Sequence, residues 1–305
     1  MKKLLAILFA CTLVFALAAC GGDSSSDEHL VYLITMDQMD QHWVTVDEGC
    51  RAAVAELDGI SYIWDAPTDG KNDVAQMEVI NNAVANGANL ILLASNGPDT
   101  QIATIQEAMS NGVKFIYVDS PANIEAYQTL ATDNRAAGTT AGQEMIAKLT
   151  ADGITSGTIG IVNVNPATTS TVLREEGFRA AFAGTGFDIL ETQYGEGQVA
   201  LSQELAANYI VQGVVGIFGT NEGGTVGVGN AISESGGTVV GVGFDTSDAI
   251  LQHIRNGDIL CTMAQNPYVM GFEGMKSAAV VLDGGTITQK NFDTGVSVIN
   301  ASNVG

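Results

Sequence analysis

Basic residues and histidines are scarce in this chain of 305 residues. Lys and Arg number 12 against 34 Asp and Glu, which gives a formal net charge of −22 at pH 7. An acidic excess of this size argues against binding to nucleic acid and against electrostatic docking on anionic lipid. The three histidines, at positions 29, 42 and 253, are too few and too scattered for a histidine-based metal site. We therefore expect neither a metal nor a cofactor.

The signatures of common enzyme classes are also missing. There is no phosphate-binding loop with lysine and no Gly-x-Ser-x-Gly elbow, and Gly227-Val-Gly229 lacks the third glycine of the dinucleotide fingerprint. The acidic run 65–73 has Pro67 at a ligand position and no closing glutamate, so it is not a helix–loop–helix calcium site. These absences favour a binding protein that is not an enzyme, with a secreted hydrolase as the alternative.

The first residues resemble a secretion signal. Lys2 and Lys3 precede an apolar run over 4–17, which is short for a membrane span. The run ends in Leu17-Ala18-Ala19-Cys20, which resembles the bacterial lipoprotein cleavage site, where the cysteine becomes the acylated first residue. We expect a signal peptide over 1–19 and a lipidated, flexible tether over 20–28, which would hold the protein on the outer face of the cytoplasmic membrane. A plain signal peptide with an incidental cysteine is the alternative.

Only two cysteines, Cys50 and Cys261, remain beyond Cys20. Their spacing gives no support to a disulfide, although an oxidising compartment would permit one. We expect buried free thiols.

The body of the chain alternates between strand and helix patterns. The apolar stretch 29–35 is typical of a strand inside a parallel sheet. Glycine after a helix adopts the left-handed conformation cheaply and turns the chain into the next strand. Four such helix–glycine–strand junctions occur, at Gly87, Gly112, Gly213 and Gly257. Because the alternation restarts near residue 157, the pattern predicts an α/β protein with parallel sheets in two lobes.

One helix is predicted in more detail. It opens near Asp73, and Gln76 stands three residues later, which is a capping-box spacing. The apolar positions predicted to face the core are Val74, Met77, Ile80 and Val84.

Four motifs stand in order in the second half of the chain. They are Leu-Arg174-Glu-Glu-Gly-Phe-Arg, Thr220-Asn221-Glu222, Val-Gly-Phe-Asp245 and Ala-Gln265-Asn-Pro-Tyr268. Together, behind a lipoprotein signal, they resemble the ribose/galactose-type periplasmic binding proteins of ABC transporters. The resemblance runs from about residue 29 to the last strand near 295–300.

The resemblance implies a type I fold of two Rossmann-like lobes. Three segments would cross between the lobes, near 131–134, 264–266 and 291–295, and a ligand would close between them at the carboxyl ends of the strands. The N-terminal lobe would comprise 29–132 and 266–293. The C-terminal lobe would comprise 133–265 and 294–305.

In the second lobe the resemblance assigns four ligand-binding residues. Arg174 matches the guanidinium that grips sugar hydroxyls, although it could instead lie on a helix surface and pair with Glu175 or Glu176. The other three are the amide Asn221, the carboxylate Asp245 and the crossing-segment amide Gln265. The alternative for the last is a hinge residue bonded to backbone.

In the first lobe the resemblance assigns a polar residue, an aromatic pair and a second carboxylate. Asp40 matches the polar ligand, and His42 and Trp43 match the pair. Trp43 could stack on the apolar face of a sugar ring, while His42 is equally compatible with ligand contact and with loop packing. Asp119 matches the polar residue at the end of the fourth strand.

Two departures from the family pattern put ribose in doubt as the sugar. Ser120 stands where ribose binders carry an arginine, and Gly197 stands near the usual aromatic of the second lobe, with Tyr194 the nearest candidate.

The expected pocket is rich in acids. It offers four carboxylates against Arg174 alone, which predicts a neutral or cationic ligand. The four are Asp37, Asp40, Asp119 and Asp245.

The function implied by the resemblance is capture of a monosaccharide and its delivery to ABC permease subunits by a monomeric protein without affinity for nucleic acid. Within the same class, Asp119-Ser120-Pro121 leaves open a receptor for a small furanose-like signal such as autoinducer-2. Transcription factors that share the fold carry an N-terminal helix-turn-helix, and here that position holds the lipoprotein signal.

Overall fold

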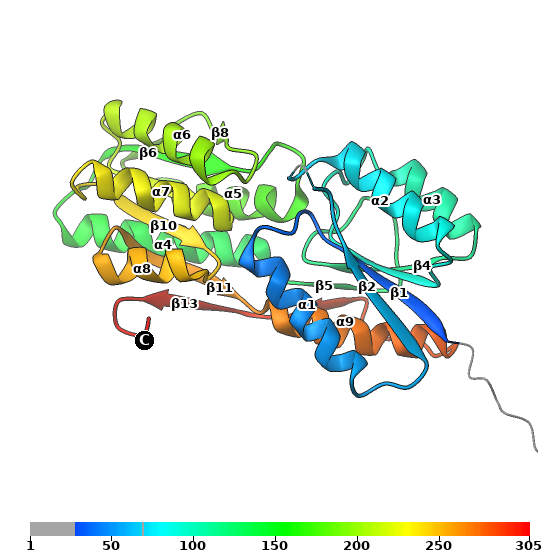
Figure 1. The fold of residues 1–305 in the computed structure, drawn as a ribbon. Coiled ribbons are helices and arrows are strands. Elements are labelled where there is room, and N and C mark those ends of the chain that lie inside the picture. The colour runs from blue at the N-terminus through cyan, green and yellow to red at the C-terminus, as the bar shows by residue number, and fades with distance from the viewer. Residues whose placement is uncertain (1–27, 69) are drawn as a thin grey trace, which may run out of the picture.

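A computed structural model describes residues 28–68 and 70–305. The expected signal peptide and Cys20 lie outside the described residues. The described chain forms two lobes, each built on one sheet with helices on both faces (Figure 1). The prediction of an α/β protein with parallel sheets in two lobes is confirmed. No helix in the described part of the chain is both long and apolar enough to span a membrane.

The first lobe is built on a parallel sheet with the strand order β12-β5-β4-β3-β1-β2. Its strands are β1 (His29–Ile34), β2 (Ile60–Asp65), β3 (Leu90–Leu93), β4 (Lys114–Val118), β5 (Thr129–Ala131) and β12 (Asn291–Asp293). Its helices are α1 (Gln41–Val54), α2 (Asp73–Ala85), α3 (Ile102–Ser110) and α9 (Pro267–Leu282).

Both faces of this sheet are buried, which explains the unbroken apolar run of β1. Val31 and Leu33 pack in a core with α1 and α9, whereas Tyr32 and Ile34 point to the opposite face and pack against α2 and α3. Successive side chains of a strand alternate between faces, so a strand covered on both sides has to be apolar throughout.

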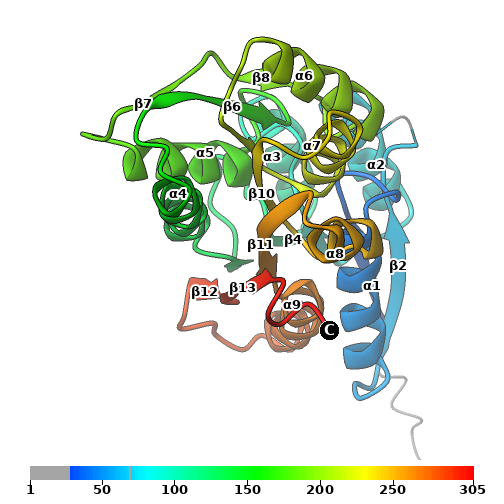
Figure 2. The same ribbon diagram turned by 90° about the vertical axis from the view of Figure 1, so that its left-hand side faces the viewer.

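The second lobe has the strand order β13-β11-β10-β9-β6-β7, with β8 paired to β6. Its strands are β6 (Gly157–Asn163), β7 (Phe187–Ile189), β8 (Gln193–Tyr194), β9 (Gly216–Gly219), β10 (Val240–Phe244), β11 (Ile259–Gln265) and the antiparallel β13 (Val296–Asn300). Helices α4 (Asn134–Ala151) and α5 (Thr169–Ala181) cover one face. Helices α6 (Val199–Val211), α7 (Glu222–Glu234) and α8 (Asp248–Asn256) cover the other (Figure 2).

The chain passes from one sheet to the other three times. The passages follow β5, β11 and β12, so that the last strand of each sheet comes from the C-terminal part of the chain. The residue boundaries assigned to the two lobes stay a prediction.

The glycines that were expected to end helices adopt the left-handed conformation. Gly87, Gly112, Gly213 and Gly257 have φ values of 86°, 90°, 82° and 85°. The two cysteines of the described residues, Cys50 and Cys261, are buried free thiols, as predicted.

The detailed prediction for α2 is wrong in two respects. The side chain of Asn72, not of Asp73, caps the helix by accepting the N–H of Ala75 at 3.0 Å. Val74 is 59% exposed, whereas Gln76 is fully buried. The amide of Gln76 donates to the backbone carbonyls that follow β1 and β3, at 2.8 Å each, so tertiary hydrogen bonds replace the expected capping box.

Candidate ligand-binding site

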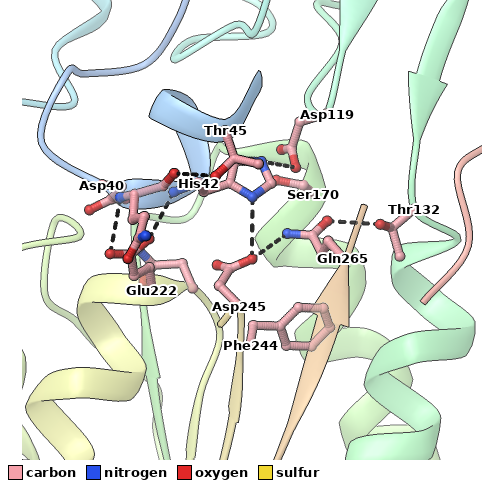
Figure 3. Close-up of polar contacts among 12 residues, drawn as sticks. Asp40, His42, Thr45, Asp119, Thr132, Ser170, Glu222, Phe244, Asp245 and Gln265 are labelled. Carbon is pink, nitrogen blue, oxygen red and sulfur yellow. Dashed lines mark hydrogen bonds and ion pairs between the residues drawn. The ribbon is translucent and has the colours of Figure 1, made fainter. Parts of the chain in front are cut away.

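Carboxylates from both lobes meet where the strands end. Asp119 directly follows β4 of the first lobe, and Asp245 directly follows β10 of the second (Figure 3). Both are non-glycine residues in the left-handed region, with φ values of 62° and 75°. This conformation is costly for such residues and persists where the surroundings hold it, which often happens at functional sites.

The imidazole of His42 lies between these two carboxylates. Its Nε2 atom is 3.4 Å from Asp119 Oδ2, and its Nδ1 atom is 3.4 Å from Asp245 Oδ1. Burial alone lowers the pKa of His42, but the interactions with the two carboxylates outweigh burial and raise this pKa to about 10. At neutral pH the ring is therefore an imidazolium that links the lobes.

Arg174 extends from α5 into the same cluster and is 2% exposed. Its Nε and Nη1 atoms donate to Asn134 Oδ1 at 2.8 Å and to the carbonyl of Thr220 at 2.9 Å. The guanidinium lies 4.2 Å from the ring centroid of Phe244. Its Nη2 atom is 3.6 Å from Asp119 Oδ2 and makes no hydrogen bond within the described residues. A buried guanidinium is thus fixed in place with one donor nitrogen unused.

The alternative placement of Arg174 on a helix surface is wrong. Glu175 pairs with Arg179 at 2.8 Å, and Glu176 pairs with Arg135. Helical periodicity directs these acids away from the cleft and Arg174 into it.

Two amides complete the second-lobe side of the site. Gln265 donates from Nε2 to Asp245 Oδ1 at 2.7 Å and accepts from Thr132 Oγ1 at 2.8 Å, so it bonds side chains rather than backbone. Asn221 is the N-cap of α7 and accepts the N–H of Gly224 at 3.1 Å. The Nδ2 atom of Asn221 is buried and has no hydrogen-bond partner among the described residues.

Glu222 is a site residue that belongs to the motif Thr220-Asn221-Glu222 but was not among the predicted ligand-binding residues. It opens α7 of the second lobe, and its carboxylate accepts the backbone N–H groups of Gln41 at 3.1 Å and His42 at 3.0 Å. These are the first residues of α1 in the first lobe, so Glu222 satisfies donors at a helix N-terminus across the cleft. Burial and the nearby charges of Asp40 and Asp245 raise the pKa of Glu222 to about 7.

Lys71 is a second residue that the sequence reasoning missed. Its Nζ atom lies 2.5 Å from Asp37 Oδ2 and 2.6 Å from Asp40 Oδ2, and its side chain is 5% exposed. The expected ratio of four carboxylates to one cation is therefore wrong, because Lys71 and the protonated His42 join Arg174 in the cleft. Nothing in the local sequence pairs Lys71 with acids about thirty residues earlier.

Trp43 belongs to both the core and the site. Its ring packs with Met36 and Val46 in the first-lobe core, stands edge-on to His42 at 4.6 Å, and is 3% exposed. It also borders the small cavity at the centre of the cleft. Tyr194, the expected substitute for the second-lobe aromatic, is 40% exposed and lies outside the lining of this cavity.

The central cavity, in this closed arrangement, measures about 20 Å³. The expected ligand-binding residues all border it, together with Lys71 and several small polar side chains; the expected set is Asp40, His42, Trp43, Asp119, Arg174, Asn221, Asp245 and Gln265. A space of that size holds about one water molecule. Entry of a sugar therefore requires the lobes to part or the imidazole of His42 to move.

Proteins of known function with similar sequences bind sugars. The ribose import binding protein of Haemophilus influenzae is 25% identical over 295 residues, which cover 95% of this chain and 97% of that protein. The D-ribose/D-allose-binding protein of Pseudomonas aeruginosa is 20% identical, with coverage of 93% and 92%.

Solved structures that are similar to this chain also include sugar-binding proteins. A carbohydrate transporter solute-binding protein from Agrobacterium radiobacter in complex with D-arabinose superposes with a TM-score of 0.86 and 27% identity, covering 91% of this chain and 96% of that one. An ABC transporter solute-binding protein from Agrobacterium vitis with bound D-fucose gives a TM-score of 0.85 and 26% identity, covering 90% and 96%. The periplasmic binding protein domain family matches residues 31–286, and the chain therefore belongs to this family as a type I periplasmic binding protein of the ribose and sugar group.

Proposed function

We propose that this protein captures a neutral monosaccharide between its two lobes and delivers it to the permease subunits of an ABC importer. It acts as a monomer and catalyses no reaction. The sugars bound by its relatives support the substrate class. The observation that carries the proposal is the arrangement of buried hydrogen-bonding groups around the central cavity.

These groups match the hydroxyls of a sugar. Arg174 Nη2 and Asn221 Nδ2 are buried donors without partners among the described residues, and a hydroxyl oxygen can accept from each. Asp119 and Asp245 are acceptors from opposite lobes, which hydroxyl protons can satisfy together. A ligand that pairs all four groups gains about 1–3 kcal/mol for each buried group that would otherwise stay unpaired. Closure around a polyhydroxylated ring is therefore favoured.

The charges of the cleft favour a neutral ligand. The cleft holds three cations, because Lys71 and His42 stand beside Arg174, and five carboxyl groups, which are those of Asp37, Asp40, Asp119, Glu222 and Asp245. An added phosphate would bring at least one more negative charge into a buried site that already has an acidic excess. A sugar phosphate should bind more weakly than the parent sugar.

The test is a ligand screen on the purified protein. Thermal shift followed by calorimetry would compare D-ribose, D-allose, D-arabinose and D-fucose with ribose 5-phosphate. We expect at least one neutral sugar to raise the Tm and bind with one-to-one stoichiometry, and the phosphate to bind more weakly than ribose. Absence of binding by every monosaccharide would refute the function, and tighter binding of the phosphate would refute the charge argument.

We also propose that Cys20 is the lipidated N-terminus and that the lipid holds the protein on the outer face of the cytoplasmic membrane. The basic, apolar and small-residue order of 2–20 supports this. In a bacterial expression host, Cys20→Ala should abolish labelling by a fatty-acid analogue and release the protein or leave it unprocessed. Correct cleavage with continued membrane retention of the variant would contradict the assignment.

A further inference from the structure

The loop between β2 and α2 places a buried ammonium group at the wall of the central cavity. Lys71 is the only cation of the acidic run 65–73 and is held by Asp37 at 2.5 Å and Asp40 at 2.6 Å. Burial lowers the pKa of Lys71, but the two carboxylates outweigh burial and hold it above its usual value. Lys71 is therefore a permanent cation in the site.

The two carboxylates that hold Lys71 differ in their other contacts. Asp37 accepts the backbone N–H groups of Met39 at 2.8 Å and Asp40 at 3.0 Å, which anchors it in its loop. Asp40 stands at the N-cap of α1 but makes no side-chain cap hydrogen bond. Its carboxylate pairs with the ammonium group of Lys71 instead. The carboxylates of Asp37 and Asp40 thus hold the ammonium group of Lys71 in one position.

The second lobe meets Lys71 with a residue that has no side chain. A Cβ atom at Gly197 would lie 2.8 Å from Cδ and 3.0 Å from Nζ of Lys71. Gly197 also has a φ of 71°, which any larger residue adopts at a cost. Lys71 therefore occupies the space that a second-lobe side chain would need, and closure of the lobes brings it into the ligand environment.

Lys71 also stands between two spaces. It borders the central cavity together with Arg174 and Asn221, and it borders a cavity of about 330 Å³ between the lobes whose lining includes Asn96 and Glu196. A ligand in the cleft would present one edge to this lysine.

An ammonium has three donors and no acceptor. Asp37 and Asp40 accept two of the three, and the described part of the chain shows no acceptor for the third. We propose, building on the sugar-binding function above, that Lys71 is a specificity-determining residue whose third proton binds one oxygen of the sugar. The site then rejects a sugar that lacks an oxygen at that position, because the buried donor would be left unpaired.

The measurement is a double-mutant cycle between the protein and the ligand. Calorimetry would compare each of D-ribose, D-arabinose, D-allose and D-fucose with its monodeoxy analogues in wild type and in Lys71→Met. In wild type we expect removal of one particular hydroxyl to weaken binding about 10- to 100-fold. In Lys71→Met the same removal should weaken binding less than twofold, while the penalties at other hydroxyls persist. A role limited to holding the loop would lower all affinities alike and leave every penalty unchanged.

The matched control is Lys276→Met on α9. Lys276 pairs with Glu56 at 2.7 Å outside the cleft, and its substitution should preserve all deoxy penalties. If Lys71→Met fails to fold, Asp37→Asn/Lys71→Met keeps the net charge of the cluster and takes its place. If the wild type binds sugar and each deoxy analogue loses the same affinity in wild type and in the variant, the specificity role of Lys71 is refuted while the proposed function stands. Absence of sugar binding in wild type overturns the proposed function, and this role falls with it.

Discussion

The charge state of His42 gives a quantitative prediction about pH. The ordinary pKa of its imidazole is 6.5, and the two carboxylates raise it to about 10 in the closed structure. A group whose folded pKa is raised contributes stability that is complete below the unfolded pKa and is lost as pH rises through the folded pKa. The window for His42 is therefore pH 6.5 to 10, and stability should fall across it.

The size of the effect follows from proton linkage. Between pH 7 and pH 9 the loss should be about 2–3 kcal/mol, since each pH unit in which one extra proton is bound changes the free energy of unfolding by about 1.4 kcal/mol. For a protein of this length, with an entropy of unfolding of about 0.6 kcal/mol/K, that corresponds to a fall in Tm of roughly 3–5 °C. The slope should largely vanish in His42→Gln, which has no proton to lose.

Two measurements check this reasoning. Thermal unfolding of wild type and His42→Gln at pH 7 and pH 9 gives the difference in the pH dependence of stability between the two proteins. NMR of the imidazole carbons follows His42 directly, because the chain has only three histidines. A midpoint at or below 6.5, with equal slopes in the two proteins, would refute the imidazolium bridge between Asp119 and Asp245.

Three further predictions concern the cleft. Arg174→Ala and Asp245→Ala should each weaken sugar binding by about 2–5 kcal/mol, because each leaves a buried partner unpaired; calorimetric affinities within threefold of wild type for both would place the site elsewhere. Glu222→Ala should weaken sugar binding by about 1–2 kcal/mol, because the backbone N–H groups of Gln41 and His42 lose their acceptors. Glu222→Gln should weaken binding less, because its single amide oxygen still accepts one of these N–H groups; equal affinities of the two variants would contradict this. Sugar should shift the tryptophan emission of wild type and Trp64→Phe but not of Trp43→Phe, and the reverse pattern would show that the first-lobe loop is misplaced.

The sequence alone determined the architecture of this protein. Strands such as β1 are covered on both faces and so are apolar throughout, and glycines such as Gly87 mark the turn from helix to strand. Both signals are local, and they can be read without knowledge of distant contacts. The details of α2 could not be read in this way, because buried tertiary partners decided that Gln76 faces inward and Val74 outward.

The sequence also supplied candidates for the site, and the structure brings them around one cavity. It did not determine their charges, which depend on distances between segments that only folding brings together. His42 is an imidazolium because Asp119 and Asp245 face it from opposite lobes, and Lys71 is held beside acids about thirty residues earlier. Glu222 meets the start of α1 across 180 positions of sequence. The residue types were thus set by the sequence, whereas their protonation and pairing were decided by tertiary structure, since electrostatic interactions depend on separation and burial.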